Sequence, residues 1–497
     1  MSVSGRRSFP AATPATQDLY RLLVLRKGGS DLLVAGERVP FTLPWVEIPR
    51  WERVAENVIA AVRKRYEISA VCLFSPELPP TTTDGEQPLY QVVETRETIA
   101  PPVGTRWLSL NSFPTHCFAD GRDFGAITSM RRQIAEFQSG DAIGPFAIPG
   151  WIEELLSWVR QSIEPYGLRL TGEFRQLNAS PRFALLRFET GKQAVWFKAV
   201  GEPNLREYPI SVALSRHFPG FVPTVIATHP TWHGWLTTEL AGRTLDNIGD
   251  ACAWQCAAQS LAELQIDSVR TTDHLLEAGC RDVRVISLLN LVEPFMDVML
   301  QLMERQPRTP PAILRRAQLQ AVGRHIKDAL SILEELDIPD TLGHLDFNPG
   351  NILCSEEQCI FLDWAEGYVG PPFLTLQYLL EHQSQMASCR ALVPRHLVDH
   401  YASRWLCQVS SSAIAAALRI APLLAVFTCA AASDWAGALD SGDERFSGYL
   451  RSLTRRMQRE SAVLHGKQSR SAVSRQSISS PCSSESPREA SQCPIQS

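Results

Sequence analysis

Asp346, Asn351 and Asp363 stand close together in the sequence, within the stretch TLGHLDFNPGNILCSEEQCIFLDW. Asp346 and Asn351 precede an apolar run that begins at Ile352, and Asp363 ends a second apolar run that follows a polar turn. This pattern indicates a catalytic loop that leads into a β-hairpin, whose second strand ends at an acidic residue.

The three side chains suit phosphoryl transfer to a hydroxyl group. That reaction needs one carboxylate to orient the hydroxyl and accept its proton, and oxygen ligands that hold Mg²⁺ against the phosphates. Asp346 suits the first role, and Asn351 and Asp363 suit the second. His344 is expected to buttress the loop through hydrogen bonds. The alternative without chemistry is an Asp-rich turn between a helix and a hairpin.

The segment HLDFNPGNIL, followed by IFLDW, resembles the catalytic loop and metal-binding aspartate of the aminoglycoside phosphotransferase and choline kinase family. The resemblance extends over residues 176–464, and its specificity lies almost wholly in the catalytic loop. It implies a bilobal protein-kinase-like fold, with a small β-rich amino-terminal lobe and a large helical carboxy-terminal lobe. It also implies an enzyme that uses ATP and Mg²⁺ to phosphorylate a hydroxyl of a small molecule. The acceptor stays open, and GTP stays open as the donor.

The resemblance further implies a nucleotide site upstream of the loop. Lys198 ends an apolar strand, as the family's phosphate-binding lysine does, and Glu207 is placed early in the next helix to pair with it. Glu239 and Leu240 are similar to the hinge whose backbone meets the adenine, and Gly242 suits a bend there. The alternatives are a solvated strand-end lysine and a glutamate that only complements a helix dipole.

The sequence departs from the family pattern at two places. The turn between the first two strands, 177–182 (LNASPR), has no glycine, which limits close approach of its backbone to phosphates. The chain also has Gly370-Pro371-Pro372 where the family often has Gly-Asp-Pro. Glu366 could hold a second metal ion or only cap a turn. The turn without glycine leaves a rival interpretation open, which is a non-catalytic binding or scaffold protein with a kinase fold.

The elements that must position these residues place the chain in the α+β class. Residues 1–150 alternate apolar runs with Pro-rich breaks and are predicted to form a small α+β domain. A helix over 51–66 is expected to pack on its sheet. Strands are expected at 20–24, 31–34 and 70–74.

The strand, loop and helix of this first region weakly resemble a Nudix-type fold. In that fold a helix with paired glutamates binds metal, but this sequence has Lys64 and Arg65 at those positions and Glu67 in place of a glycine. Two cations cannot coordinate Mg²⁺, so we expect no hydrolase activity. The region would be a degenerate module that docks a partner or substrate, or an unrelated α+β domain.

Residues 151–464 are predicted to form the kinase-like domain, with strands first and helices after. Strands are expected within 175–200 and at 235–240, and helices at 205–216, 251–264 and 294–304. The last of these helices is expected to carry Pro294 in its first turn. Residues 465–497 are Ser-rich with few large apolar side chains, so they are predicted to form a disordered tail.

Composition argues against several classes of partner. Lys and Arg number 48 against 53 Asp and Glu, so the chain has no cationic excess to neutralise nucleic acid or anionic lipid. The most apolar segment, 413–432, has Arg419 in its middle, which indicates a buried helix instead of a membrane span. We therefore expect no nucleic-acid and no membrane partner, and a small hydroxylated molecule as substrate. A protein partner of residues 1–150 stays open.

The cysteines indicate the compartment. Twelve cysteines are scattered over the chain without the spacing of a zinc site. They are expected to be free, buried thiols, which predicts a cytoplasmic location.

Overall fold

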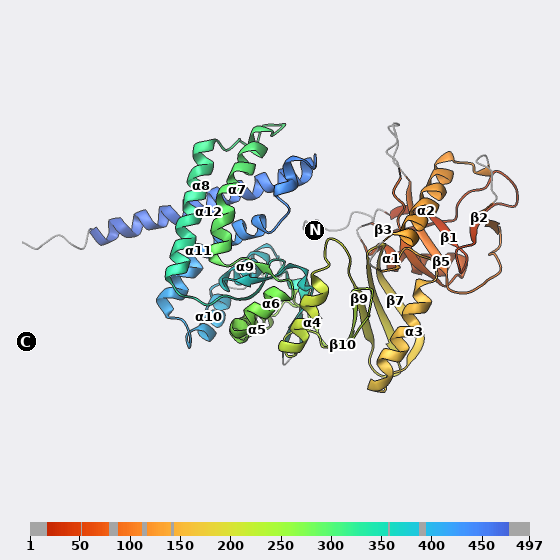
Figure 1. Ribbon diagram of the computed structural model, residues 1–497, viewed down its shortest axis with the longest axis horizontal. Helices are drawn as coiled ribbons and strands as arrows, with labels where there is room; N and C mark the ends of the chain where they lie inside the picture. Colours follow the sequence, from red (N-terminus) through yellow and green to blue (C-terminus); the bar gives the residue numbers. More distant parts are fainter. Residues whose placement is uncertain are drawn as a thin grey trace, which may run out of the picture. The chain divides into compact units, whose positions relative to one another are not determined.

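The computed structural model describes residues 17–50, 52–78, 88–111, 117–140, 144–355, 358–386 and 394–476 of the 497-residue chain. The described residues form two compact units, and Figure 1 labels the helices and several of the strands. The first unit takes the chain as far as Ser260, together with Asp273–Cys280 and Pro349–Gly367. The second unit takes Leu261–Thr272, Arg281–Asn348 and the chain from Tyr368 onward.

A six-stranded mixed sheet opens the first unit. Its order is β4-β5-β1-β2-β6, and β3 also pairs with β1. β1 runs parallel to β5 and antiparallel to β2 and β3. The strands are β1 (Gln17–Leu25), β2 (Asp31–Ala35), β3 (Trp45–Pro49), β4 (Ala70–Phe74), β5 (Leu89–Thr95) and β6 (Thr105–Ser109). The strands expected at 20–24, 31–34 and 70–74 are thereby confirmed.

Helices cover both faces of this sheet, which explains why the run Leu22–Leu25 is fully buried. Leu22 and Val24 pack with α1 (Val54–Tyr66), because alternate side chains of a strand point to opposite faces. Leu23 and Leu25 join a core on the other face with α2 (Gly121–Ser139) and α3 (Trp151–Ile163). The helix expected over 51–66 is therefore present, and it starts at Val54.

The second sheet of the first unit has five antiparallel strands in the order β10-β11-β9-β8-β7. Its elements, with the helix that follows β9, are β7 (Leu170–Ser180), β8 (Phe183–Thr190), β9 (Val195–Ala199), α4 (Glu207–His217), β10 (Val225–Thr228) and β11 (Gly234–Thr238). One core continues from the first sheet through α3 into this one, where Trp158 and Phe197 have ring centroids 5.8 Å apart. The α+β class is confirmed, and the domain limits at residues 150 and 464 stay predictions.

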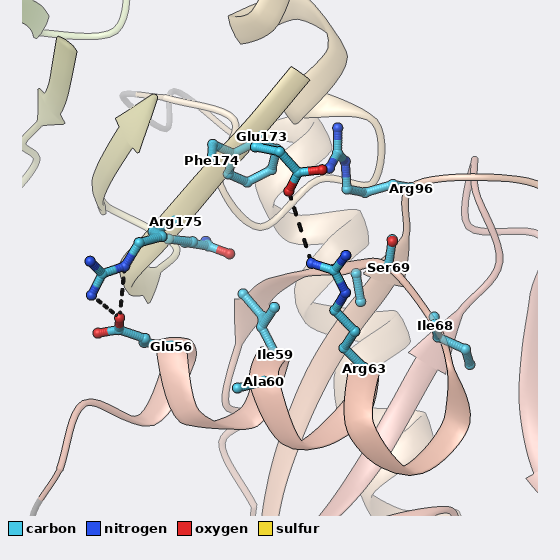
Figure 2. A pocket seen from close by; sticks show the side chains of 12 residues that line it. Glu56, Ile59, Ala60, Arg63, Ile68, Ser69, Arg96, Glu173, Phe174 and Arg175 are labelled. Carbon is cyan, nitrogen blue, oxygen red and sulfur yellow. Dashed lines mark hydrogen bonds and ion pairs between the residues drawn. The ribbon is translucent and has the colours of Figure 1, made fainter. Parts of the chain in front are cut away.

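The amino-terminal region is joined to β7 by specific polar contacts. Gln176 accepts a hydrogen bond from the Cys72 N–H (2.8 Å) and donates one to the Cys72 carbonyl (2.9 Å). Gln176 therefore satisfies backbone groups at the free edge of β4. Figure 2 shows the neighbouring ion pairs, in which Glu56 of α1 meets Arg175 and Arg63 lies 3.9 Å from Glu173. A pocket of about 300 Å³ lies among these side chains.

The predicted hairpin is confirmed as β15 (Ile352–Cys354) and β16 (Cys359–Phe361). A short strand, β12 (Arg243–Thr244), pairs with β15 and completes a three-stranded sheet. Gly242 precedes β12 with φ 137°, and a Cβ there would lie 2.6 Å from the Cys354 carbonyl oxygen. Only glycine fits this crossing, so the expected bend at Gly242 is confirmed.

The second unit is mainly helical, with a small sheet in the order β13-β17-β14. α7 and α8 lie side by side (Figure 1). The helices that belong wholly to this unit are α7 (Val285–Glu304), α8 (Arg316–Glu335), α9 (Phe373–Gln385), α10 (Pro394–Trp405), α11 (Ser411–Ala431) and α12 (Glu444–Gln476). The small strands are β13 (Arg281–Asp282), β14 (Thr341–His344) and β17 (Gly367–Gly370), and α5 (Ala251–Ser268) begins in the first unit and ends in the second.

Two helix limits differ from the sequence predictions. α7 begins at Val285, so Pro294 lies inside it and not in its first turn. Leu288 and Val292 are buried on this helix, and their packing sustains it through a proline that lacks an N–H. α12 continues past His465, where the tail is predicted to begin, and its last residues include Gln, Arg and Ala, which favour a helix. Residues 477–497 of that predicted tail lie outside the described residues.

Two described helices, α7 and α11, have the length and apolar composition that could cross a membrane. Within the structure, 67% of the apolar window of α11 and 39% of that of α7 are buried against other parts of the protein. The burial of α11 agrees with the buried helix expected at 413–432.

Candidate active site

Lys198 lies near the end of β9, on the face opposite to the apolar core. Val195, Phe197 and Ala199 of this strand are buried in the core, and Lys198 alternates with them. The Lys198 Nζ bonds to the Glu207 carboxylate and lies 2.7 Å from Oδ1 of Asp363. Lys198 and Glu207, from a strand and the next helix, therefore meet Asp363, which lies 165 positions after Lys198, in one ion cluster.

Glu207 occupies the first turn of α4 and is 2% exposed. Burial, with a smaller effect of the Asp363 charge, raises the pKa of Glu207 to about 7 against the opposing charge of Lys198. Burial alone would lower the pKa of Lys198, but the Glu207 and Asp363 carboxylates outweigh it and raise that pKa above its ordinary value. The ammonium of Lys198 is thus held charged in a half-buried place.

Asp363 follows β16 in a left-handed conformation with φ 63°, which is uncommon for a residue other than glycine. Its side chain is 48% exposed, so one oxygen contacts Lys198 and the carboxylate still meets solvent. Asn351 lies at the same end of the hairpin, because its carbonyl accepts the N–H of Leu362 at 2.8 Å. The two predicted metal ligands are therefore brought to one end of β15 and β16.

The donor set fits a metal ion that is held partly by a substrate. Among the described residues, no three His, Cys, Asp or Glu side chains gather closely enough to hold a metal ion by themselves. Mg²⁺ is usually bound by one or two protein carboxylates and completed by phosphates and water. Asp363 and the amide of Asn351 could supply the protein's part of such a site.

Asp346 belongs to the second unit and is exposed. Its backbone N–H donates to Nδ1 of His344 at 3.1 Å, and the Asn348 amide donates to its carboxylate at 3.2 Å. His344 is 1% exposed, and its own N–H donates to the Thr375 hydroxyl at 3.0 Å. These contacts show His344 as the buttress expected of it, with Nδ1 acting as an acceptor.

Sequence reasoning missed the residues that hold this loop from outside. A Cβ at Gly343 would lie 2.0 Å from the ring of Tyr368. The Tyr368 hydroxyl bonds to the carbonyl of Pro371 (3.1 Å) and to the Thr375 hydroxyl (2.9 Å). Gly343 is thus required for a close contact between β14 and β17. The only sign of Gly343 in the sequence is its position directly before His344.

Side chains of two helices interact electrostatically with Asp346 and were also missed. Burial lowers the pKa of His382 on α9, and the Asp346 charge opposes that shift. Burial raises the pKa of Tyr449 on α12, and the Asp346 charge adds a smaller upward shift. Nothing in the local sequence of α9 or α12 marks these residues, because only the tertiary fold brings them toward Asp346.

The predicted hinge is engaged within the protein. The Glu239 carboxylate accepts hydrogen bonds from Nε (2.6 Å) and Nη2 (2.7 Å) of Arg187, and this guanidinium lowers the pKa of Glu239. The backbone of Glu239 donates to the Ala194 carbonyl at 2.9 Å and accepts from the Gln193 amide at 2.6 Å. Leu240 is half-buried beside it. The structure therefore does not bring Glu239 into the Lys198 cluster.

The turn without glycine is closed by its own side chains. The Arg182 N–H donates to the Ser180 hydroxyl at 3.3 Å. A Cβ at Gly201, just after β9, would lie 2.8 Å from the Arg182 carbonyl oxygen. The close backbone approach in this region therefore falls at Gly201, outside the turn.

No family model matches the sequence, and no curated protein matches it. Similar solved structures include a macrolide 2'-phosphotransferase from Brachybacterium faecium (15% identity, TM-score 0.40, 61% of this chain and 98% of that one). A choline/ethanolamine kinase family protein from Mesorhizobium loti is 16% identical (TM-score 0.42, 61% and 94%). An ethanolamine kinase from Plasmodium vivax is 13% identical (TM-score 0.44, 68% and 96%). These proteins belong to the group that the catalytic-loop motif resembles, and the comparisons give no support to the Nudix-like resemblance.

Proposed function

We propose that this protein is an ATP- and Mg²⁺-dependent phosphotransferase that transfers the γ-phosphate to a hydroxyl group of a small molecule. The observation that carries the proposal is the ion cluster of Lys198, Glu207 and Asp363. It offers a fixed cation for phosphate oxygens directly beside an exposed carboxylate that suits a metal ion.

Each residue of the chain has a defined task in this proposal. Lys198 binds the α- and β-phosphate oxygens, and Glu207 keeps its ammonium in place. Asn351 and Asp363 hold Mg²⁺, which when bound neutralises charge on the phosphate oxygens. Asp346 orients the acceptor hydroxyl and takes its proton on a carboxylate oxygen.

The nucleotide base and the compartment complete the proposal. We place the base beside Glu239 and Leu240, at the end of β11, with GTP as the other donor to test. A cytoplasmic location is proposed from the cysteines, of which nine lie in the described residues as free thiols.

A second function, a non-catalytic binding protein with a kinase fold, is favoured by one observation. The turn between β7 and β8 has no glycine and is closed by the hydrogen bond from Arg182 to Ser180. Such a turn offers fewer free backbone amides to a nucleotide than a glycine-rich loop does. This function predicts no response of the protein to MgATP.

Turnover and thermal unfolding of the full-length protein separate the two functions. ADP formation is measured with MgATP against a panel of hydroxylated metabolites and antibiotics. Asp346→Asn is expected to lower turnover by about 10²–10⁴-fold, whereas Asp440→Asn, an exposed carboxylate in the second unit, serves as the matched control. A nucleotide at 100 times its Kd adds about 2.7 kcal/mol to the stability of the protein that binds it. An unchanged melting temperature at millimolar MgATP, with no turnover on the panel, would favour the binding protein.

A further inference from the structure

The hairpin that ends at Asn351 and Asp363 also carries two cysteines that face each other. Cys354 on β15 pairs in register with Cys359 on β16, and their sulfur atoms lie 3.0 Å apart. Both are free thiols, with exposures of 5% and 1%. Neither cysteine has a task in the proposed phosphotransferase reaction.

The backbone of the hairpin places this pair where a cross-strand disulfide fits. The Ser355 N–H donates to the Gln358 carbonyl (2.9 Å), and the Leu362 N–H donates to the Asn351 carbonyl (2.8 Å). Hydrogen-bonded and non-hydrogen-bonded pairs alternate along an antiparallel ladder, so the cysteine pair lies at a non-hydrogen-bonded position. Cα atoms at such a position are about 4.5 Å apart. That separation falls within the range of about 4.4–6.8 Å that a disulfide spans.

A third thiol touches the pair. Cys256 on α5 is half-buried, and its hydrogen bond is the largest cause that raises the pKa of Cys359. The hydrogen bond between Cys359 and Cys354 lowers the pKa of Cys354. Of the two hairpin thiols, Cys354 is also the more exposed, at 5% against 1%, so an oxidant is expected to meet Cys354 first.

We propose that Cys354 and Cys359 are a site of reversible oxidation, at which a peroxide joins them in a cross-strand disulfide. The Cys354 thiolate attacks one oxygen of hydrogen peroxide, and the O–O bond breaks, which gives a sulfenic acid and, after protonation, water. The Cys359 sulfur then attacks the Cys354 sulfur and displaces the hydroxyl, which leaves with the Cys359 proton as a second water. Two thiols lose two electrons and two protons, and one peroxide is reduced to two waters.

The bond closes the hairpin into a covalent ring. The sulfurs need to approach by about 1 Å to reach the S–S length of about 2.05 Å, so the strands stay paired. The ring lies between Asn351 and Asp363 in the sequence and beside Gly242, whose missing Cβ makes room for the Cys354 carbonyl. Oxidation therefore cross-links the hairpin that carries both proposed metal ligands, Asn351 and Asp363. In a reducing compartment such a bond is transient.

Thiol mapping of the reduced full-length protein tests the proposal without any enzymatic assay. The protein is treated with hydrogen peroxide, free thiols are alkylated, and peptides are identified by mass spectrometry. We expect Cys354 and Cys359 to lose alkylation together, in one disulfide-linked product that dithiothreitol reverses. Cys256→Ser is expected to keep the bond, and in Cys354→Ser the Cys359 thiol is expected to stay alkylatable.

Two results would overturn the proposal. One is full alkylation of both hairpin cysteines at a peroxide concentration that oxidises Cys252 and Cys407, which are exposed and act as internal references. The other is a disulfide that maps to Cys256 and Cys359. Because the readout is a covalent bond, its failure leaves the proposed phosphotransferase function untouched, and a failure of that function leaves this site standing.

Discussion

The ammonium of Lys198 bonds to the carboxylate of Glu207, which is buried in the first turn of α4. The same ammonium lies 2.7 Å from Asp363, so one cation links β9, α4 and the hairpin of β15 and β16. Two carboxylates share one positive charge here. The cluster can therefore accept a further cation, such as a metal ion, without leaving Lys198 unpaired.

Removal of this cation is the first prediction. Lys198→Ala is expected to lower turnover by about 10²–10³-fold, because a preorganised charge that meets the phosphates is lost. ADP formation at saturating acceptor measures the effect. Lys192→Ala is the matched control, since Lys192 is an exposed lysine in the turn between β8 and β9. Turnover of the Lys198 variant within twofold of the control would contradict the role of this residue.

The raised pKa of Glu207 predicts a pH dependence of stability. The pKa is about 7 in the folded protein against an ordinary value of 4.5, so between these values the folded protein keeps a proton that the unfolded chain releases. The contribution of Glu207 to the free energy of unfolding is therefore full below pH 4.5 and falls as the pH rises to about 7.

Glu207→Gln isolates this effect, because glutamine does not titrate. Denaturant unfolding of both proteins is compared at pH 5 and pH 8. The wild-type protein is expected to lose free energy of unfolding relative to the variant as the pH rises. A difference that stays constant, or that moves the other way, would show that Glu207 is ionised at pH 5.

The loop that carries Asp346 supplies the third prediction. Gly343→Ala places a Cβ 2.0 Å from the Tyr368 ring, so β14 and β17 must separate, at a cost of about 1–3 kcal/mol or more. Turnover is expected to fall as well, because His344 and Asp346 follow directly. Gly125→Ala on α2 is the control and is expected to keep or raise the stability. Its Cβ meets nothing within 4 Å, and alanine has a higher helix propensity than glycine. Equal melting temperatures for the two variants would refute the requirement for glycine.

The chemistry of the catalytic segment could be predicted from the sequence because its residues are neighbours along the chain. Asp346, Asn351 and Asp363 are separated by short runs whose alternation fixes a hairpin, and the structure has that hairpin. Lys198 and Glu207 could be predicted because a strand and the next helix are adjacent elements. Their contact with Asp363 depends on tertiary packing, which local patterns do not encode.

The residues that sequence reasoning missed depend on partners that are distant along the chain. Gly343 is needed because the Tyr368 ring lies against it, and His382 matters because the Asp346 charge affects its pKa. Neither role leaves a signal within the residue's own element. α7 begins earlier than predicted, because Pro294 has the features of a helix start but buried side chains extend the helix through it. Glu239 fits the position of a hinge, but the sequence could not show that Arg187 and Gln193 already engage it.

The last prediction concerns the contact that fixes β7. Gln176 is 3% exposed and bonds to both backbone groups of Cys72, on the free edge of β4. Gln176→Leu keeps the volume but leaves that N–H and C=O buried without their partner, at roughly 1–3 kcal/mol for each group.

Denaturant unfolding of the full-length protein measures the effect, and Gln301→Leu on an exposed position of α7 is the control for the added apolar surface. A register shift follows Gln176 in the pairing of β7 with β8, between Gln176 and Asn178, and three paired positions separate it from the turn at Arg182. The hydrogen bonds of Gln176 go to Cys72 and not to the catalytic loop, so the variant is expected to leave the kcat of the proposed reaction little changed. A variant as stable as the Gln301 control would show that the amino-terminal region does not hold β7 through this side chain.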